Sequence, residues 1–332
     1  MTRSYERINY ALRPAKAIER RMLCETFGRL YPFQPVDSYG YIGFGSIYFS
    51  DFQLIHRNLG INDLLSIERD EDNAKRFEMN LPYGCISMDF RESGVVLPTL
   101  NWNKRRVVWL DYDGTLDTDV LADAATLASK ATSGTMIVFS VNAHPVAEPT
   151  EEARKITEAK QGAPFRLADY RLSKLQENLP EKIPTDVTGT MLDMKGTPQV
   201  LRRVLLGEIN AKLAVRNGSL PDAEQLAFVQ VLHFVYQDGA QMLTLGGVLV
   251  AKQELAMFEA CRFGELPFYR QDDRPFPIKV PCLTPREMHQ LNSFLPSDDP
   301  TQLKREGIPD ADVKRYAEVY RYFPNYSEIV FA

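Results

Sequence analysis

The sequence has little of what marks a secreted, metal-binding or membrane-spanning protein. It contains four cysteines and four histidines, and neither type occurs in the paired spacing of a structural zinc site. No run of 18 apolar residues is present, and the N-terminus has no apolar signal core. We therefore expect a cytoplasmic protein with reduced thiols, no metal site and no membrane association.

An excess of basic residues is also missing. The chain has 39 Lys and Arg against 44 Asp and Glu, for a formal net charge of -5, which argues against a globally basic nucleic-acid-binding protein. Residues 1–36 are nevertheless locally basic. Their apolar stripe predicts a helix from Pro14 that covers an edge of the sheet and exposes a charged face. As an alternative, Arg13 and Lys16 bind an anionic ligand or partner.

The chain is organised around residues 38–68, which predict a strand, a turn, a helix and a second strand. The apolar-aromatic run 39–44 is typical of a strand, and the apolar period from Ile47 to Leu59 predicts a helix. The second strand, 63–67, ends at an acid, Glu68.

The turn between the first strand and the helix carries Gly43, Gly45 and Ser46. In a parallel sheet, ligands bind at the carboxyl ends of the strands. Glycines there let the backbone approach a nucleotide, and an acid about 20 residues further on can bind ribose hydroxyls. Glu68 fits that second role. The alternative is a tight strand-to-helix turn without a ligand.

Strand and helix patterns alternate five times up to residue 145. The strands are expected at 39–44, 63–67, 85–90, 107–110 and 136–141. Continuous apolar runs such as the last two are typical of strands buried on both faces. This alternation predicts an α/β fold with a doubly wound, mostly parallel sheet. Asp111 and Asp113 are expected where the fourth strand ends.

The second half of the chain has a different rhythm. Polar helical patterns fill 146–226, and two apolar runs then surround an Asp238-Gly239 turn, a strong hairpin signal. Helices are expected near 252–261, 284–294 and 310–321, and a short strand at 327–332. Aromatic residues near the C-terminus indicate either packing of the last helix or a partner surface: Tyr316, Tyr320, Tyr322, Phe323 and Tyr326.

Five segments are therefore expected along the chain. They are an N-terminal helical segment (1–36), a Rossmann-like core (37–145), a helical insertion (146–226), a β-hairpin that completes the sheet (227–250) and a helical C-terminal extension (251–332).

The segments LRPAKAIERRM, YIGFGSIYFSDF, LLSIE, RFEMNLP and VVWLDYDG resemble class I S-adenosylmethionine-dependent methyltransferases. The resemblance covers about residues 38–145 and 228–250 and is closest to a group of O-methyltransferases. It implies a Rossmann-like sheet with a C-terminal antiparallel hairpin and S-adenosyl-L-methionine as cofactor. The implied enzyme activity is methyl transfer to an oxygen or nitrogen acceptor, whose identity the residues do not indicate.

The resemblance also assigns site residues. It places Gly43, Gly45 and Ser46 at the methionine part of the cofactor, Glu68 at the ribose, Asp89 and Phe90 at the adenine, and Asp111 and Asp113 at the transfer site as the catalytic pair.

Two positions depart from the family pattern. Tyr41 stands where the glycine motif normally begins with an acid, and Ile47 replaces its third glycine. Asp51 is a candidate to supply the missing carboxylate. After the fifth strand, Asn142 and His144 are expected near the mouth of the site, as a hydrogen-bonding group and a base, respectively, or as incidental loop residues.

Two other functions compete with methyl transfer. VVWLDYDGTLD matches the D-x-D-G-T signature of haloacid-dehalogenase-like phosphatases, in which Asp111 is the nucleophile and Asp113 the acid/base beside Mg²⁺. That signature normally lies on the first strand of its domain, whereas three strands precede it here. The third candidate is a Rossmann-like scaffold, catalytically weak or inactive, that acts through partners. A protein partner or a homo-oligomer stays open.

Overall fold

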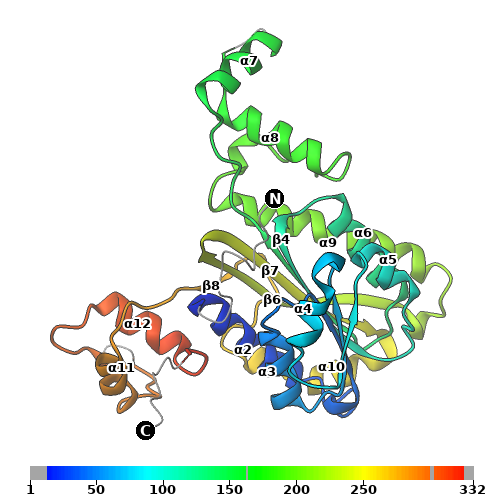
Figure 1. The fold of residues 1–332 in the computed structure, drawn as a ribbon, viewed down its shortest axis with the longest axis vertical. Coiled ribbons are helices and arrows are strands. Elements are labelled where there is room, and N and C mark those ends of the chain that lie inside the picture. The colour runs from blue at the N-terminus through cyan, green and yellow to red at the C-terminus, as the bar shows by residue number, and fades with distance from the viewer. Residues whose placement is uncertain (1–12, 162–163, 300–302, 325–332) are drawn as a thin grey trace.

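The computed structural model describes residues 13–161, 164–299 and 303–324, and these form one sheet with helices on both faces (Figure 1). The strands are β1 (Gly40–Gly43), β2 (Asp63–Ile67), β3 (Ile86–Asp89), β4 (Arg106–Thr115), β5 (Met136–Asn142), β6 (Leu226–Asp238), β7 (Ala240–Ala251) and β8 (Phe276–Ile278). The helices are α2 (Pro14–Gly28), α3 (Ser50–Leu59), α4 (Ala74–Met79), α5 (Ser93–Val96), α6 (Thr118–Lys130), α7 (Glu151–Gln161), α8 (Leu167–Asn178), α9 (Gly196–Asn217), α10 (Leu255–Ala260), α11 (Pro285–Asn292) and α12 (Asp310–Val319).

The strand order is β3-β2-β1-β4-β5-β7-β6-β8. Strands β1 to β5 pair in parallel, while β7 runs antiparallel to both β5 and β6. The chain reverses between β6 and β7 at Gly239, whose φ of 79° suits a glycine. The prediction of a Rossmann-like class I methyltransferase sheet with a C-terminal hairpin is confirmed.

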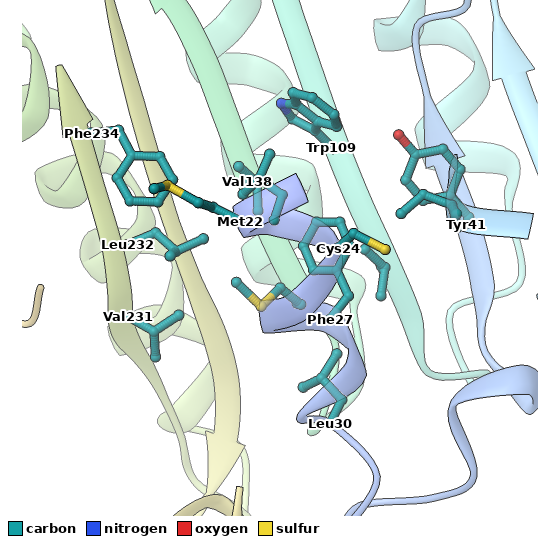
Figure 2. Close-up of a cluster of buried hydrophobic side chains, with 14 of the residues drawn as sticks. Met22, Cys24, Phe27, Leu30, Tyr41, Trp109, Val138, Val231, Leu232 and Phe234 are labelled. Carbon is teal, nitrogen blue, oxygen red and sulfur yellow. The ribbon is translucent and has the colours of Figure 1, made fainter. Parts of the chain in front are cut away.

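Each face of the sheet has its own hydrophobic core, because successive strand residues point to opposite sides. Tyr41 and Trp109 belong to the core beneath α2 and α3, whereas Ile42 and Val108 belong to the core beneath α6 and α9. Figure 2 shows Met22 and Phe27 of α2 among side chains of the central strands and the β6 strand. A third, smaller cluster joins α11 and α12, which lie to one side of the sheet (Figure 1).

Helix α2 differs from its prediction in two respects. Its apolar stripe is buried as expected, with Ile18, Met22 and Phe27 fully covered. However, the helix lies over a face of the sheet rather than along an edge (Figure 2). Its polar side is not uniformly solvated, because Lys16 and Arg20 are buried as well.

Three local predictions were wrong in detail. Helix α3 begins at Ser50 rather than Ile47, because Phe49 has left-handed backbone angles (φ 46°) that no helix interior accepts. Strand β4 continues to Thr115, so Asp111 and Asp113 lie within it rather than after it. Strand β8, parallel to β6, was not predicted, since its three residues lie in a proline-rich segment.

The C-terminal aromatic residues pack as side chains of the core. Tyr316 and Tyr322 are buried, and the Tyr322 ring meets Phe268 edge-on at 5.4 Å between centroids. The expected strand at 327–332 and Tyr326 lie outside the described residues. Among the described helices, none combines the length and the apolar character needed to cross a membrane.

Gly247 on β7 offers a test of this packing. A Cβ atom added there would lie 2.6 Å from the carbonyl oxygen of Val229 on the neighbouring strand. We expect Gly247→Ala to lower the free energy of unfolding by about 1–3 kcal/mol, as overpacking does, in urea denaturation. Gly207→Ala is the matched control, because nothing lies within 4 Å of that Cβ on α9. The control is expected to gain about 0.5–1 kcal/mol; an unchanged Gly247→Ala would contradict the close strand packing.

Candidate functional site

The predicted cofactor residues meet at one edge of the sheet. Gly43 is in register with Ser66 on β2 and with Trp109 on β4. Since these strands are parallel, Glu68, just beyond β2, and Asp111, two residues past Trp109, extend from the same edge. The fold therefore brings Gly43 to the same edge as Glu68 and Asp111, which follow it by 25 and 68 positions in the chain.

The glycines of the turn are required by close packing. A Cβ on Gly43 would lie 3.1 Å from the carbonyl oxygen of Trp109. A Cβ on Gly45 would collide with the Ser66 hydroxyl, which accepts a hydrogen bond from the Gly45 N–H at 3.0 Å. Packing alone explains both glycines, and it holds the turn low over the carboxyl ends of the strands. Ser46 continues this turn and accepts a bond from the Tyr48 N–H.

Tyr41, at the position of the missing acid, reaches a carboxylate on the next helix. Its hydroxyl donates to Asp51 Oδ2 at 3.1 Å, and its ring packs edge-on against Phe52. Burial raises the pKa of Asp51, with Arg20 opposing this shift and Asp111 adding to it. Burial, and then the Asp51 charge, raises the pKa of Tyr41 well above its usual value. The side chain of Tyr41 therefore contacts the carboxylate of Asp51 on α3.

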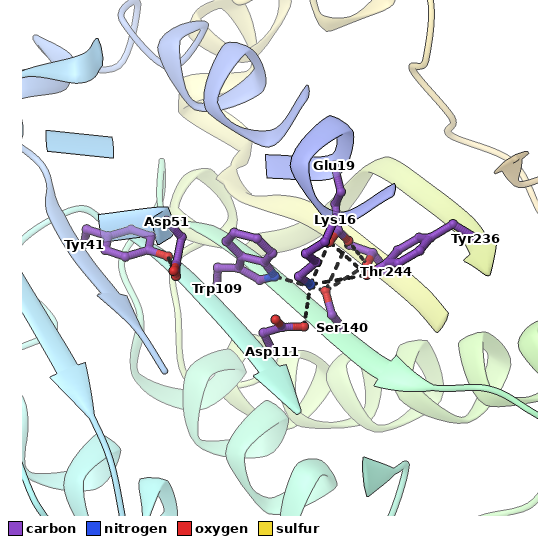
Figure 3. A network of polar contacts seen from close by, with 9 residues as sticks. All are labelled: Lys16, Glu19, Tyr41, Asp51, Trp109, Asp111, Ser140, Tyr236 and Thr244. Atoms are coloured by element: carbon purple, nitrogen blue, oxygen red, sulfur yellow. Dashed lines mark hydrogen bonds and ion pairs between the residues drawn. The ribbon is translucent and has the colours of Figure 1, made fainter. Parts of the chain in front are cut away.

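A buried polar network joins α2 to the other end of this edge (Figure 3). Lys16 Nζ lies 2.7 Å from Asp111 Oδ1 and 2.7 Å from Glu19 Oε2. It also lies 4.7 Å from the centre of the Trp109 ring. Burial alone would lower the pKa of Lys16, but Asp111 and Glu19 outweigh burial and leave this pKa above its ordinary value. Lys16 is therefore a buried cation held by two carboxylates.

The rest of the network satisfies Glu19, which is fully buried. The hydroxyls of Tyr236 and Thr244 both donate to its carboxylate. Ser140 accepts from the Trp109 indole N–H at 3.0 Å. Helix α2 and strands β4 to β7 each contribute a side chain (Figure 3). The Asp111 side chain, one quarter exposed, is where the network comes nearest to solvent.

Glu68 lies just past β2 and is partly buried. Its Oε1 accepts the Asp70 N–H at 3.0 Å, which fixes the direction of the carboxylate. Burial raises the pKa of Glu68, and the bond from Asp70 opposes the shift. Such an acid is suited to accept hydrogen bonds from a pair of hydroxyl groups.

The remaining predicted residues lie further from this centre. Asp89 ends β3 and is paired with Arg91 at 2.6 Å, while Phe90 packs edge-on against Phe77. Asp113 is exposed on the last part of β4. Asn142 ends β5 and accepts the His144 N–H.

A magnesium site does not accompany the D-x-D-G-T signature. Within the described parts of the chain, no three His, Cys, Asp or Glu side chains are arranged to hold a metal ion. Asp111, the nucleophile of the phosphatase alternative, is instead paired with a buried lysine. The residues therefore do not fit the cation that such a phosphatase requires.

Most of the polar network was not predicted from the sequence. In the alternative interpretation, Lys16 binds an anionic ligand or partner, whereas the structure pairs its charge with Glu19 and Asp111. Glu19 and Tyr236 were not singled out. A signal was present, because Lys16 and Glu19 lie three residues apart on the side of α2 that carries the buried Leu23 and Phe27, and ions on an apolar face need partners.

Asp51 provides a test through pH. Because burial raises its pKa, the folded protein binds this proton more tightly than the unfolded chain does. Ionisation of Asp51 therefore reduces stability as the pH rises from below 3.8 through the folded-state pKa. Asp51→Asn keeps an acceptor for Tyr41 without the charge. We expect a higher melting temperature at pH 7, and a gain that shrinks as the pH approaches 3.8.

The exposed Asp37→Asn is the control for that experiment. It is expected to leave the melting temperature unchanged at both pH values. A loss of stability in Asp51→Asn at pH 7 would show that the ionised carboxylate is needed by the fold itself.

Comparisons with known proteins give a family and remote structural matches. The family model described as "Putative O-methyltransferase" matches residues 8–331. No curated protein matches the sequence.

Among solved structures, Trm1 from Pyrococcus horikoshii in complex with S-adenosyl-L-methionine aligns with 9% identity and a TM-score of 0.42, over 78% of this chain and 64% of that one. The N-methyltransferase NodS from Bradyrhizobium japonicum WM9, in complex with S-adenosyl-L-homocysteine, aligns with 10% identity and a TM-score of 0.34, over 72% and 89%. An O-methyltransferase family protein from Burkholderia thailandensis aligns with 11% identity and a TM-score of 0.34, over 71% and 57%.

The chain thus spans less than two thirds of the length of the first and third of these proteins. By contrast, the family model matches nearly the whole of this chain. On that match, the chain belongs to the family described as "Putative O-methyltransferase".

Proposed function

We propose that this protein is a cytoplasmic enzyme that transfers a methyl group from S-adenosyl-L-methionine to an oxygen or nitrogen acceptor. The observation that carries the proposal is the set of carboxylates around the glycine turn. Asp51, Glu68 and Asp111 come from separate elements, and all three lie at the carboxyl edge of β1, β2 and β4. The family match supports the same reaction.

The residues at this edge fit the chemistry of the cofactor. Its ribose carries a pair of hydroxyl groups, for which the fixed carboxylate of Glu68 is an acceptor. Its methionine part ends in an ammonium group, for which Asp51 is the suitable partner. We assign Gly43, Gly45 and Ser46 to that part because their turn lies at the carboxyl end of β1. We assign Asp89 and Phe90, at the end of the neighbouring β3, to the adenine.

Asp51 gives the altered glycine motif a physical explanation. Burial of the Asp51 carboxylate costs free energy and raises its pKa, although the Arg20 charge and the Tyr41 hydroxyl oppose the shift. A bound ammonium group offsets that cost, because an opposite charge nearby favours the ionised form. Tyr41 keeps Asp51 Oδ2 in place through its hydroxyl. The acid that the family carries on the strand is thus supplied here from α3.

At the acceptor side, the chain contributes orientation and a proton acceptor. When bound, S-adenosyl-L-methionine supplies an electrophilic methyl group, so the protein mainly aligns the acceptor. Lys16 fixes Asp111 through Oδ1, and Asp111 Oδ2 is the atom that takes a proton from an acceptor hydroxyl or amine. Asp113, exposed further along β4, is the second acid that we assign to the acceptor side.

No observation favours the phosphatase or the inactive scaffold. The acceptor, any protein partner and the oligomeric state are not identified by these residues. The locally basic N-terminal segment gives little support to an anionic partner, because the Lys16 charge within it is already paired.

Glu68→Ala tests the cofactor site directly. We expect binding of S-adenosylhomocysteine, measured by calorimetric titration, to weaken about 10- to 100-fold, the range for hydrogen bonds to a charged group. The melting temperature should stay close to that of the wild type, because Glu68 receives a single backbone bond.

Glu71→Ala, an exposed acid three residues further on, is the matched control and should bind like the wild type. Wild-type affinity in Glu68→Ala would remove Glu68 from the site. A wild-type protein that binds no S-adenosylhomocysteine would refute the proposed function.

A further inference from the structure

A cavity of about 210 Å³ lies at the carboxyl edge of β4 and β5. Its floor includes Thr115 of β4 and Asn142 of β5, which are paired in the sheet. On β5, Asn142 lies two residues beyond Ser140, the partner of Asp111. At about 3.3 Å per strand residue, this floor begins roughly 7 Å from the Asp111 level. A molecule held in the cavity therefore lies past the Asp111 level of β4, although Asp111 itself does not line the cavity.

The walls of the cavity come from the helices between β5 and β6. Helix α8 contributes Arg171 and Leu175, the segment before α9 contributes Leu192, and the first turn of α9 contributes Thr197. Both leucines are buried and give the cavity an apolar side. Helices α7 and α8 project from the body of the molecule above this edge (Figure 1).

Arg171 is held in place with part of its guanidinium unused. Its Nε donates to the Val146 carbonyl at 2.9 Å, and its Nη1 donates to the Leu192 carbonyl at 3.0 Å. Among the described residues, no acceptor bonds to its Nη2. The carboxylate of Asp193, which interacts electrostatically with Arg171, is already bound by the backbone N–H groups of Lys195 and Gly196. Arg171 therefore brings a fixed positive charge to the cavity.

Other polar groups of the lining are donors as well. Asn142 uses its Oδ1 for the His144 N–H, which leaves its amide NH₂ group. The hydroxyl of Thr197 is buried, and in the described structure it has no hydrogen-bond partner. No Asp or Glu is among the described residues that line the cavity. A buried hydroxyl without a partner costs free energy unless a ligand or water satisfies it.

From these features we propose that the cavity is the acceptor site and that it takes a small organic acid. The carboxylate of the ligand pairs with Arg171, the pairing that a planar guanidinium favours. Its apolar body lies against Leu175 and Leu192. The remaining end lies at the carboxyl ends of β4 and β5, near Thr115 and Asn142. That the bound acid is the methyl acceptor rests on the proposed methyltransferase function, whereas binding of the acid depends only on the cavity.

The test compares matched pairs of small aromatic acids and their primary amides, with benzoate and benzamide, and 4-hydroxybenzoate and 4-hydroxybenzamide, as probes. Saturation-transfer NMR on the full chain, with and without S-adenosylhomocysteine, measures their binding. We expect the acids to bind at least about tenfold more tightly than the amides, since a charged hydrogen bond is lost in the amides. Arg171→Gln should reduce the affinity for the acids to that for the amides.

Arg216→Gln is the matched control. Arg216 also donates to two backbone carbonyls, those of Ala128 and Ala131, but it does not line the cavity. Arg216→Gln should keep the preference for acids. It thereby separates the loss of hydrogen bonds to backbone carbonyls from the loss of the positive charge at the cavity. Thr197→Val, which keeps the shape of the side chain, should weaken acid binding without loss of stability, and it decides the matter if Arg171→Gln fails to fold.

Equal binding of acids and amides, or an unchanged preference in Arg171→Gln, would overturn the proposal. So would a wild-type protein that binds S-adenosylhomocysteine but none of the acids. If S-adenosylhomocysteine does not bind while the acids do, the proposed function fails and the anion site stands. The two proposals therefore fail separately.

Discussion

The structure depends on the buried ion pairs of Lys16. Lys16 is held between Glu19 and Asp111 at 2.7 Å each, beneath a face of the sheet. Removal of one member of a buried ion pair leaves an uncompensated charge, which costs about 3–5 kcal/mol in proteins generally. The pairing therefore sets the position of α2 on the sheet. It also fixes the orientation of Asp111, the carboxylate through which the network reaches the site.

This arrangement connects the N-terminal helix with the proposed chemistry. In most doubly wound folds, the site is built from loops at the carboxyl ends of strands. Here α2, which precedes the first strand and lies over one face of the sheet, contacts the end of β4 through Lys16 (Figure 3). On the other side of Trp109, the Tyr41 hydroxyl of β1 donates a hydrogen bond to the carboxylate of Asp51 on α3 (Figure 3). Two carboxylates are thus positioned by side chains rather than by loops.

The sequence predicted the sheet well because period and order are local properties. Apolar runs such as 107–110 and 136–141 identify buried strands without knowledge of their partners. The Asp238-Gly239 turn likewise fixes the hairpin by itself. Strand β8 escaped prediction because three residues in a proline-rich segment carry no period.

The candidate site was predicted in part. Gly43, Glu68 and Asp111 could be grouped because parallel strands bring their carboxyl ends to one edge. The partners of those residues could not be predicted, since Lys16 and Asp111 are 95 positions apart and no local pattern couples them. The cavity beneath α8 was equally invisible, because it depends on where the helices after β5 fold back onto the sheet.

Hydrogen–deuterium exchange of the full chain, with and without S-adenosylhomocysteine, tests the central claim most directly, because it locates a ligand along the backbone. The account predicts slower exchange in peptides covering 43–53, 64–73 and 107–115, with no change in α11 and α12. Unchanged exchange at these three stretches under saturating ligand, or protection confined to α11 and α12, would contradict the placement of the cofactor at the carboxyl edge of β1, β2 and β4.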